Sequence, residues 1–293
     1  MTDLHRIALP TGVALDVATV GDPAHPPMIL LHGFPESHRT WRHVMPDLAR
    51  DHFVIAPDQR GYARSSKPDG VAAYTPDKPV ADLIALADHF AIDRFTLVAH
   101  DWGGAIAWMA ALKHPERIAR LVIINAPHPL IFQRTLFDDA EQRAASQYMT
   151  AFRNPGFERH IESVGLSAFF DSSFAKHTDL AAMAGDKSAY LDEWAQPGAL
   201  TAMLNWYRAS AIVVPAMDAT PERPAWLDAP FPPLVMPVLV IWGLRDIALR
   251  PSQLSGLDAL VPDLTIVKVD AGHFVPWENP AAVIAAIREW ETA

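Results

Sequence analysis

The sequence predicts an α/β fold, with a mostly parallel central sheet flanked by helices and a helical segment inserted between two of its strands. Three observations lead to this prediction. Short apolar runs rich in Val, Ile and Leu recur along the chain, helical patterns lie between them, and the alternation stops over residues 129–228 before it resumes. Alternating strands and helices are typical of doubly wound parallel sheets.

The elements follow in order. Residues 5–20 alternate apolar with polar side chains around a Thr11-Gly12 turn, which predicts an antiparallel hairpin at the sheet edge. Later apolar runs, bounded by turn or helix-start residues, predict strands buried on both faces. These runs span residues 28–31, 53–56, 95–99, 121–124, 238–242 and 264–269. Helical periodicity predicts helices over residues 39–50, 80–90, 102–113 and 281–290.

The interruption predicts two lobes. We assign residues 1–128 and 229–293 to one sheet core, and residues 129–228 to an inserted helical cap, or lid. The insertion is rich in aromatic and Met residues and has helical patterns without a convincing buried strand. Prolines are frequent over residues 221–237, and they are expected to hold the joint at a fixed angle.

Composition excludes several classes of function. The 293 residues carry a net charge of −10, which argues against a nucleic-acid partner because phosphate binding needs a positive field. The chain has no cysteine, so a thiol nucleophile, a disulfide framework and a Cys-bound metal are excluded. No apolar stretch approaches the length of about 18 residues that a membrane span needs.

Patterns that the sequence lacks indicate where the protein is located and which ligands it does not bind. The beginning of the chain lacks a secretion-signal pattern, so a cytoplasmic location is expected. Neither a glycine-rich phosphate loop nor a metal-spaced histidine cluster occurs in the sequence, so we expect no cofactor and no metal. We expect a monomer or a homodimer.

Residues 98–104, VAHDWGG, have the form of a nucleophile elbow between a predicted strand and a predicted helix. Small residues let the chain turn sharply there, and the exposed central residue is Asp101 instead of serine. The alternative is that Asp101 merely caps the helix that follows. Because the chain contains no Gly-x-Ser-x-Gly, a serine esterase is disfavoured.

Two further features favour catalysis over capping. Phe34 follows the first buried run, where its N–H and that of Trp102 are candidate donors to an oxyanion. Asp246 and His273 each lie just beyond a predicted strand, so they should meet Asp101 at the carboxyl edge of the sheet. A carboxylate nucleophile suits attack on saturated carbon because it leaves an ester, whereas serine would leave an ether.

The chain resembles the epoxide hydrolases of the α/β-hydrolase fold, which are related to haloalkane and haloacetate dehalogenases. The resemblance covers nearly the whole chain through five segments in the same order: residues 32–36 (HGFPE), 58–62 (DQRGY), 100–104 (HDWGG), 125–129 (NAPHP) and 271–273 (AGH). It implies that Asp101 is the nucleophile, His273 the base and Asp246 its orienting acid. The implied reaction converts a small apolar epoxide and water to a vicinal diol through an ester on Asp101.

Epoxide hydrolases and dehalogenases differ in the leaving group that the enzyme must stabilise. Epoxide hydrolases use cap tyrosines as proton donors, and Tyr207, in LNWYR, resembles the motif for one of them, with Tyr148 as a looser match for the second. Fluoroacetate dehalogenases carry arginines where this chain has Trp102 and Ala105. Haloalkane dehalogenase is the runner-up because Trp102 could cradle a halide, although Phe34 occupies a position that often holds the second halide donor.

A non-catalytic small-molecule receptor is a remote alternative, since one fold can host unrelated functions. Seven further residues, near the motifs or in the cap, are candidates for substrate binding: His32, Pro35, His100, His128, Phe152, Trp206 and Phe274.

Overall fold

The computed structural model describes residues 3–174, 183 and 185–292. Within these residues one eight-stranded sheet has the order β1-β2-β4-β3-β5-β6-β7-β8. The strands span Asp3–Ala8, Ala14–Val20, Pro27–Leu31, Phe53–Pro57, Phe95–His100, Ile118–Ile124, Val238–Gly243 and Leu264–Val269. β1 pairs antiparallel with β2 and β2 with β4, whereas all pairs from β4 to β8 are parallel. The predicted fold class and edge hairpin are confirmed.

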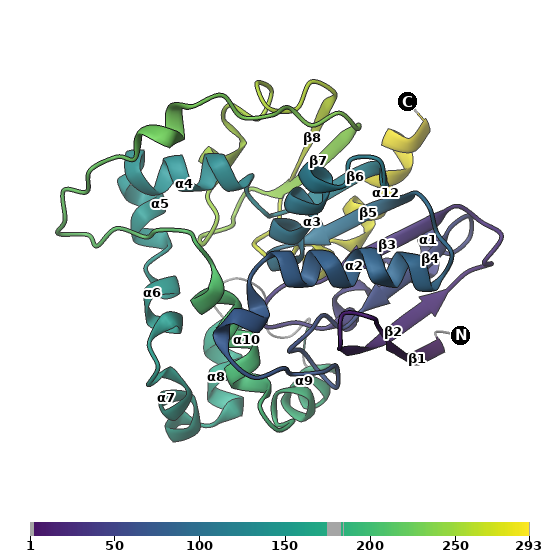
Figure 1. Ribbon diagram of the computed structural model, residues 1–293, viewed down its shortest axis with the longest axis horizontal. Helices are drawn as coiled ribbons and strands as arrows, with labels where there is room; N and C mark the ends of the chain where they lie inside the picture. Colours follow the sequence, from purple (N-terminus) through teal and green to yellow (C-terminus); the bar gives the residue numbers. More distant parts are fainter. Residues whose placement is uncertain (1–2, 175–182, 184, 293) are drawn as a thin grey trace.

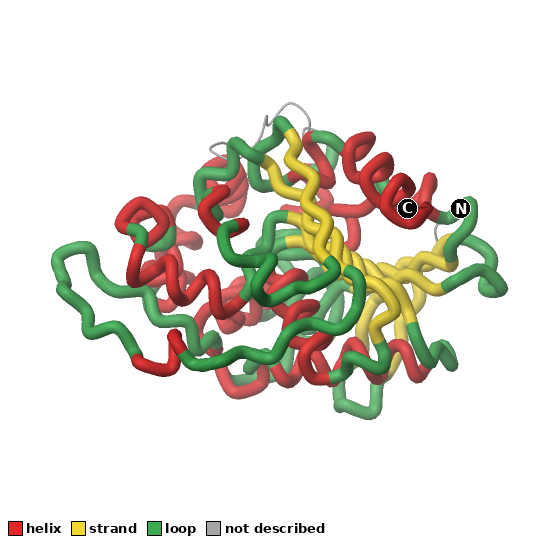
Figure 2. The backbone as a smooth tube through the Cα atoms, turned by 90° about the horizontal axis from the view of Figure 1, so that it is seen from above, coloured by secondary structure: helices red, strands yellow, loops and turns green. Residues whose placement is uncertain are grey.

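Helices cover both faces of the twisted sheet (Figure 2). The core helices are η1 His38–Trp41, α1 Met45–Leu48, η2 Val71–Tyr74, α2 Asp77–His89, α3 Trp102–Lys113, η5 Pro251–Leu254, α11 Val275–Glu278 and α12 Pro280–Thr292. Residues of η1, α1, α11 and α12 pack in one apolar cluster with alternate strand residues such as Leu30 and Val98. Residues of α2 and α3 pack with the other set, which includes Leu97 and Ile123.

Two sequence expectations are corrected. The continuous helix predicted over residues 39–50 is wrong, because η1 and α1 are separate short helices. Pro46 lies in the first turn of α1, where its missing N–H is tolerated, but a proline inside a longer helix would break it. Burial on both faces is also wrong for residues 264–269, since β8 is an edge strand and Ile266 remains 37% exposed.

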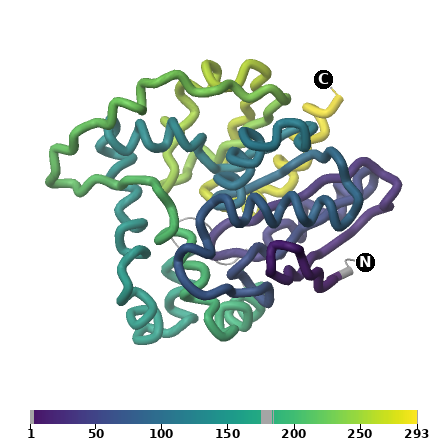
Figure 3. Tube along the Cα trace, in the orientation of Figure 1, coloured from purple at the N-terminus to yellow at the C-terminus, as the bar shows by residue number. Residues whose placement is uncertain are grey.

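Between β6 and β7 the chain forms what we call the inserted lobe. Its described residues form helices and no strand: α4 Pro129–Asp138, α5 Ala140–Ala145, α6 Tyr148–Arg153, α7 Phe157–Val164, α8 Leu166–Phe174, α9 Lys187–Trp194, α10 Ala199–Ala209 and η4 Ala225–Asp228. The lobe lies to one side of the sheet (Figure 1), and both chain ends lie on the other side (Figure 3). The division at residues 128 and 229 into core and cap stays a prediction.

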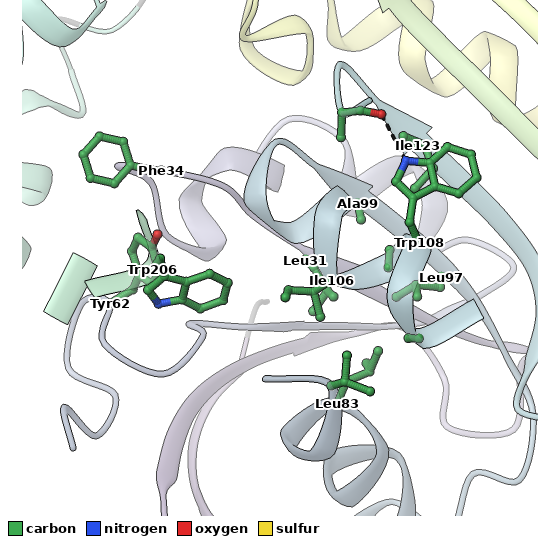
Figure 4. Close-up of a cluster of buried hydrophobic side chains, with 14 of the residues drawn as sticks. Leu31, Phe34, Tyr62, Leu83, Leu97, Ala99, Ile106, Trp108, Ile123 and Trp206 are labelled. Atoms are coloured by element: carbon green, nitrogen blue, oxygen red, sulfur yellow. Dashed lines mark hydrogen bonds between the residues drawn. The ribbon is translucent and has the colours of Figure 1, made fainter. Parts of the chain in front are cut away.

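Indole hydrogen bonds join the inserted lobe to the core. Trp206 on α10 donates through Nε1 to the Arg60 carbonyl at 3.1 Å, and Trp194 on α9 donates to the Pro35 carbonyl at 2.9 Å. One apolar cluster contains residues of the sheet and of the lobe. Figure 4 shows part of it, with Trp206 at one end and Trp108, bonded to a carbonyl oxygen, at the other.

Candidate active site

Asp101 occupies the sharp turn between β5 and α3. Its φ of 50° and ψ of −121° lie in a region that L residues rarely adopt and that structures retain mainly at functional sites. Over the described residues, the Asp101 side chain makes no capping bond to α3, so the capping alternative is disfavoured. A Cβ on Gly33 would overlap the Asp101 side chain, and a Cβ on Gly104 would overlap that of Ala126. Small residues are therefore needed on both sides of this turn.

A tight turn presents a backbone amide to this carboxylate. Glu36 N–H donates to the Gly33 carbonyl at 3.1 Å and closes the turn, which leaves Phe34 and Pro35 at its tip. Phe34 N–H donates to Asp101 Oδ1 at 2.7 Å. Trp102 is the first residue of α3, where backbone amides have no acceptor within the helix.

His273 and Asp246 meet Asp101 as their positions after β8 and β7 predict. His273 Nδ1 lies 2.7 Å from Asp246 Oδ2, and His273 Nε2 lies 3.5 Å from Asp101 Oδ2. A carboxylate can only accept, so this contact places a proton on Nδ1. Asp246 Oδ1 accepts from the amides of Ala248 and Leu249 at 2.8 and 2.9 Å. These bonds fix the Asp246 carboxylate and, through it, the imidazole ring.

The three groups stabilise one another's charged forms. Burial opposes ionisation, but the charges and hydrogen bonds of Asp246 and Asp101 raise the pKa of His273 well above its ordinary value. Burial also opposes ionisation of Asp101, yet bonding to His273 lowers the pKa of Asp101 below its usual range. Burial is likewise outweighed at Asp246, whose pKa is lowered first by the His273 charge. All three shifts favour a protonated His273 between two ionised carboxylates.

Two cavities, of about 480 and 440 Å³, share Asp101, Tyr148 and Tyr207 in their linings. The Tyr207 ring packs edge-on against Trp102 at 5.0 Å and lies 6.1 Å from the Tyr148 ring, centroid to centroid. Burial first, and then negative charge that includes Asp101, raises the pKa of both tyrosines. Both hydroxyls therefore stay protonated and can donate.

The cavities differ in their walls. Apolar side chains dominate the first, including Ile106, Met109, Phe132, Met149 and Ile212. The second is lined largely by aromatic side chains and includes three of the predicted substrate-binding residues, Pro35, Phe152 and Phe274.

The other four candidates are buried and do not line either of these two cavities; they are His32, His100, His128 and Trp206. His32 uses both ring nitrogens locally, with Nδ1 2.9 Å from the Gly33 carbonyl and Nε2 accepting from Gln59 N–H at 3.0 Å. His128 accepts from the Leu130 amide at the start of α4.

His100 belongs to a buried network behind the nucleophile. Its Nδ1 lies 2.7 Å from Glu36 Oε2, and its Nε2 lies 2.9 Å from the His273 carbonyl. Glu36 also accepts from the Gly33 amide at 3.2 Å. The network therefore links the turn, the strand before Asp101 and the His273 loop.

Sequence reasoning missed Asn125 as a structural support of the site. Its Nδ2 donates to Asp246 Oδ2 at 2.7 Å, and its Oδ1 accepts from Gly243 N–H at 2.7 Å. Its φ of 40° lies in the left-handed region, which asparagine tolerates better than most residues. The available signal was its place directly after a buried strand, within residues 125–129.

Neither a cluster of metal-binding side chains nor a membrane-spanning helix occurs in the described part of the chain. There, no group of three or more His, Cys, Asp or Glu side chains could hold a metal ion. Among the helices described, none has both the length and the hydropathy to cross a bilayer.

Comparisons with known proteins show the family of the chain. A model of the alpha/beta hydrolase fold family matches residues 26–280. The chain is 34% identical to the AB hydrolase superfamily protein YfhM of Bacillus subtilis, over 95% of this chain and 94% of that protein. It is 29% identical to epoxide hydrolase A of Mycobacterium tuberculosis, over 98% and 97%. A solved structure among novel epoxide hydrolases from metagenomes of hot environments superposes with a TM-score of 0.92 at 47% identity, over 99% of both chains.

Proposed function

Because the chain belongs to the α/β-hydrolase fold family and is a hydrolase of that superfamily, we propose that it converts epoxides to vicinal diols through an ester on Asp101. The epoxide hydrolases to which it is similar along nearly its whole length support this reaction class. The observation that carries the proposal is the placement of Asp101, Tyr148 and Tyr207 at the junction of two apolar cavities.

In the first half-reaction the Asp101 carboxylate attacks a ring carbon of the epoxide. Oδ1 is held by the Phe34 amide, so Oδ2 is the oxygen that forms the new C–O bond. The strained C–O bond of the ring breaks, and its electron pair stays on the epoxide oxygen. Tyr148 or Tyr207 donates the proton that this alkoxide needs, and a positioned general acid of this kind typically contributes 10²–10⁴-fold to the rate.

In the second half-reaction water attacks the ester carbonyl carbon of Asp101. His273 takes a proton from that water, and Asp246 holds the imidazole in the tautomer that leaves Nε2 available. Negative charge develops on Oδ1, to which the Phe34 amide already donates, and the Trp102 amide at the start of α3 is the second donor that we propose. Collapse of the tetrahedral intermediate breaks the ester C–O bond, and the departing alkoxide takes the proton of the newly added hydroxyl. The diol is released, and Asp101 is again a carboxylate beside the protonated His273.

Ester formation itself prepares the base. Once Asp101 is esterified its negative charge is gone, so one of the two charges that raise the pKa of His273 is removed. The imidazolium can then give up its proton, which restores the hydroxyl of the tyrosine that protonated the alkoxide and leaves His273 neutral as the base. Protonated His273 in the resting site and neutral His273 as the later general base are thus two states of the same residue.

The test is a single turnover with enzyme in excess, in water enriched in ¹⁸O, on one aryl and one alkyl epoxide. The label is expected in the Asp101 carboxylate and not in the diol, because water attacks the ester carbonyl. His273→Gln should accumulate an enzyme–substrate adduct visible by intact mass, while Asp101→Asn should form none. Label found directly in the diol, with none in the protein, would overturn the covalent mechanism.

An assay with haloalkanes alongside the epoxides distinguishes epoxide hydrolysis from the alternative reaction, haloalkane dehalogenation. An alkoxide needs a proton and a halide does not, so the protonated hydroxyls of Tyr148 and Tyr207 favour an epoxide over a haloalkane as the substrate. Diol formation that greatly exceeds halide release is the expected outcome. Halide release without diol formation would contradict the assignment to epoxides.

A further inference from the structure

We infer that Trp194, on α9 of the inserted lobe, is a positioning residue whose indole N–H sets the oxyanion-binding amide of Phe34 by holding the Pro35 carbonyl. This inference rests on the proposed function and assigns to the lobe a part in ester hydrolysis.

The bond acts at the tip of the turn that carries the Phe34 amide. Trp194 Nε1 donates to the Pro35 carbonyl at 2.9 Å, and the Trp194 side chain is buried, with 3% of the residue exposed. Proline has no N–H, so its carbonyl is the one backbone group at that position that can be hydrogen-bonded. The Glu36–Gly33 bond closes the base of the turn, whereas the indole fixes its tip.

The indole is itself firmly held. Its ring packs against those of Phe169, Phe170 and Phe174, at centroid distances of 5.4, 5.6 and 6.2 Å. The preceding residue, Glu193, accepts from Arg39 Nε at 2.8 Å, and Arg39 follows the turn closely in sequence. Adjacent residues of α9 therefore contact the core at the tip of the turn and just after it.

The same aromatic cluster reaches the loop of the base. Phe174 packs against Phe274, the neighbour of His273, at 4.9 Å, and against Trp277 at 5.1 Å. The lobe thus contacts both segments that ester hydrolysis uses, the oxyanion turn and the His273 loop. The packing of the lobe against the core therefore positions the groups that act in the second half-reaction, and the lobe also covers the substrate.

The two half-reactions depend differently on this bond. Negative charge leaves Asp101 Oδ1 when the ester forms and returns to it when water attacks. A misplaced Phe34 amide therefore slows mainly the hydrolysis of the ester. Removing an oxyanion donor outright typically costs 10²–10³ in rate, so a displaced donor should cost less, about tenfold. If hydrolysis slows while ester formation does not, kcat and KM fall together and kcat/KM is retained.

The experiment compares Trp194→Phe with Trp108→Phe. Trp108 is the matched control because its buried indole also donates to a backbone carbonyl, that of Ala126, at 3.1 Å, but it lies away from the oxyanion turn. Steady-state kcat and KM are measured with an epoxide, together with the fraction of enzyme present as the Asp101 ester by rapid quench and intact mass. We expect kcat and KM of Trp194→Phe to fall about tenfold with ester accumulation, and Trp108→Phe to match the wild type in all three.

A shape-matched replacement separates the hydrogen bond from packing. Substituting β-(3-benzothienyl)alanine at position 194 exchanges the N–H for sulfur and keeps the ring size, so it should reproduce the Trp194→Phe kinetics even if the smaller ring destabilises the fold. Unchanged kcat in that variant, or a loss of kcat/KM without ester accumulation, would overturn the positioning role. A wild-type enzyme that turns over epoxide with no ester on Asp101 would instead overturn the proposed mechanism.

Discussion

At the scale of the residue, the two oxygens of Asp101 have different environments before any substrate binds. Oδ1 accepts from the Phe34 amide at 2.7 Å, while Oδ2 lies 3.5 Å from His273 Nε2. An isolated carboxylate has equivalent oxygens, so the surrounding turn and base distinguish them. In the mechanism that we propose, this difference makes Oδ2 the attacking oxygen and Oδ1 the oxygen that later carries the negative charge.

The tyrosines give the residue-scale prediction. Tyr148→Phe and Tyr207→Phe should each lower the rate of ester formation about tenfold, because the remaining hydroxyl still reaches the same cavity junction. The double variant should lose at least 10²-fold, as expected for removal of a general acid. Single-turnover quench measures the rate of ester formation directly.

Tyr74→Phe is the control for the tyrosine variants. Its hydroxyl donates to the Pro68 carbonyl at 2.9 Å, so this variant loses a tyrosine hydrogen bond outside the cavity linings of the described residues. Substantial epoxide opening by the double variant, at a rate comparable to that of Tyr74→Phe, would refute the assignment of the tyrosines.

Local patterns in the sequence predicted part of the candidate site. Asp101 stands out because an elbow has a fixed spacing of small residues, and Asp246 and His273 because each follows a strand. Nothing local separates a histidine that lines a cavity from one that is buried beside it, and His32 and His100 are of the second kind. The contact of Trp194 with Pro35 joins residues far apart in the chain, so only the folded lobe reveals it.

At the scale of the element, single residues decide where helices begin. A helical pattern over residues 39–50 predicted one helix, but Pro46 is tolerated only in the first turn of a helix, so α1 begins separately at Met45. Over residues 264–269 the apolar run predicted a buried strand, but its composition could not show that β8 lies at the sheet edge. Periodicity reports the type of an element, whereas neighbours in space decide its burial.

His128 provides a prediction for α4, whose first amides it caps. Its Nδ1 accepts from Leu130 N–H at 3.3 Å, so the folded state needs the neutral ring. Burial, and then the charge of Arg134, lowers the pKa of His128 to about 4, whereas an unfolded histidine titrates near 6.5. Between these values the unfolded chain binds a proton that the folded chain does not, so stability falls as pH decreases through this window.

Near pH 4, the difference between the pKa of His128 in the folded and unfolded states lowers the free energy of unfolding by about 3 kcal/mol. His128→Asn keeps a capping acceptor but cannot titrate, so its free energy of unfolding should fall less steeply than that of the wild type between pH 6.5 and 4. Urea unfolding at several pH values measures both slopes, and pH 8, where neither state is protonated, is the internal reference. Parallel curves for the two proteins would contradict the prediction.

At the scale of the whole molecule, the inserted lobe and the sheet share one apolar cluster. Indole hydrogen bonds from Trp206 and Trp194 and the Arg39–Glu193 ion pair cross the same boundary. The inserted lobe therefore cannot separate from the sheet without exposing apolar surface of the shared cluster to water. We therefore expect the lobe and the sheet to unfold as one cooperative unit, although chains of this length often contain units that unfold separately.

Phe170→Ala tests this cooperativity from within the lobe. Phe170 is 1% exposed and packs on α8 against Phe174 at 4.7 Å, so its truncation should cost about 3–5 kcal/mol. If lobe and sheet unfold together, native-state hydrogen exchange at Leu97 and Val98 in β5 should lose protection by the same free energy, because their exchange then requires the global transition. Val164→Ala, at a position that is 45% exposed, should leave that protection within about 0.5 kcal/mol of the wild type. Strand amides that keep full protection in Phe170→Ala would mean that the lobe opens by itself, and substrate could then reach Asp101 without any unfolding of the sheet.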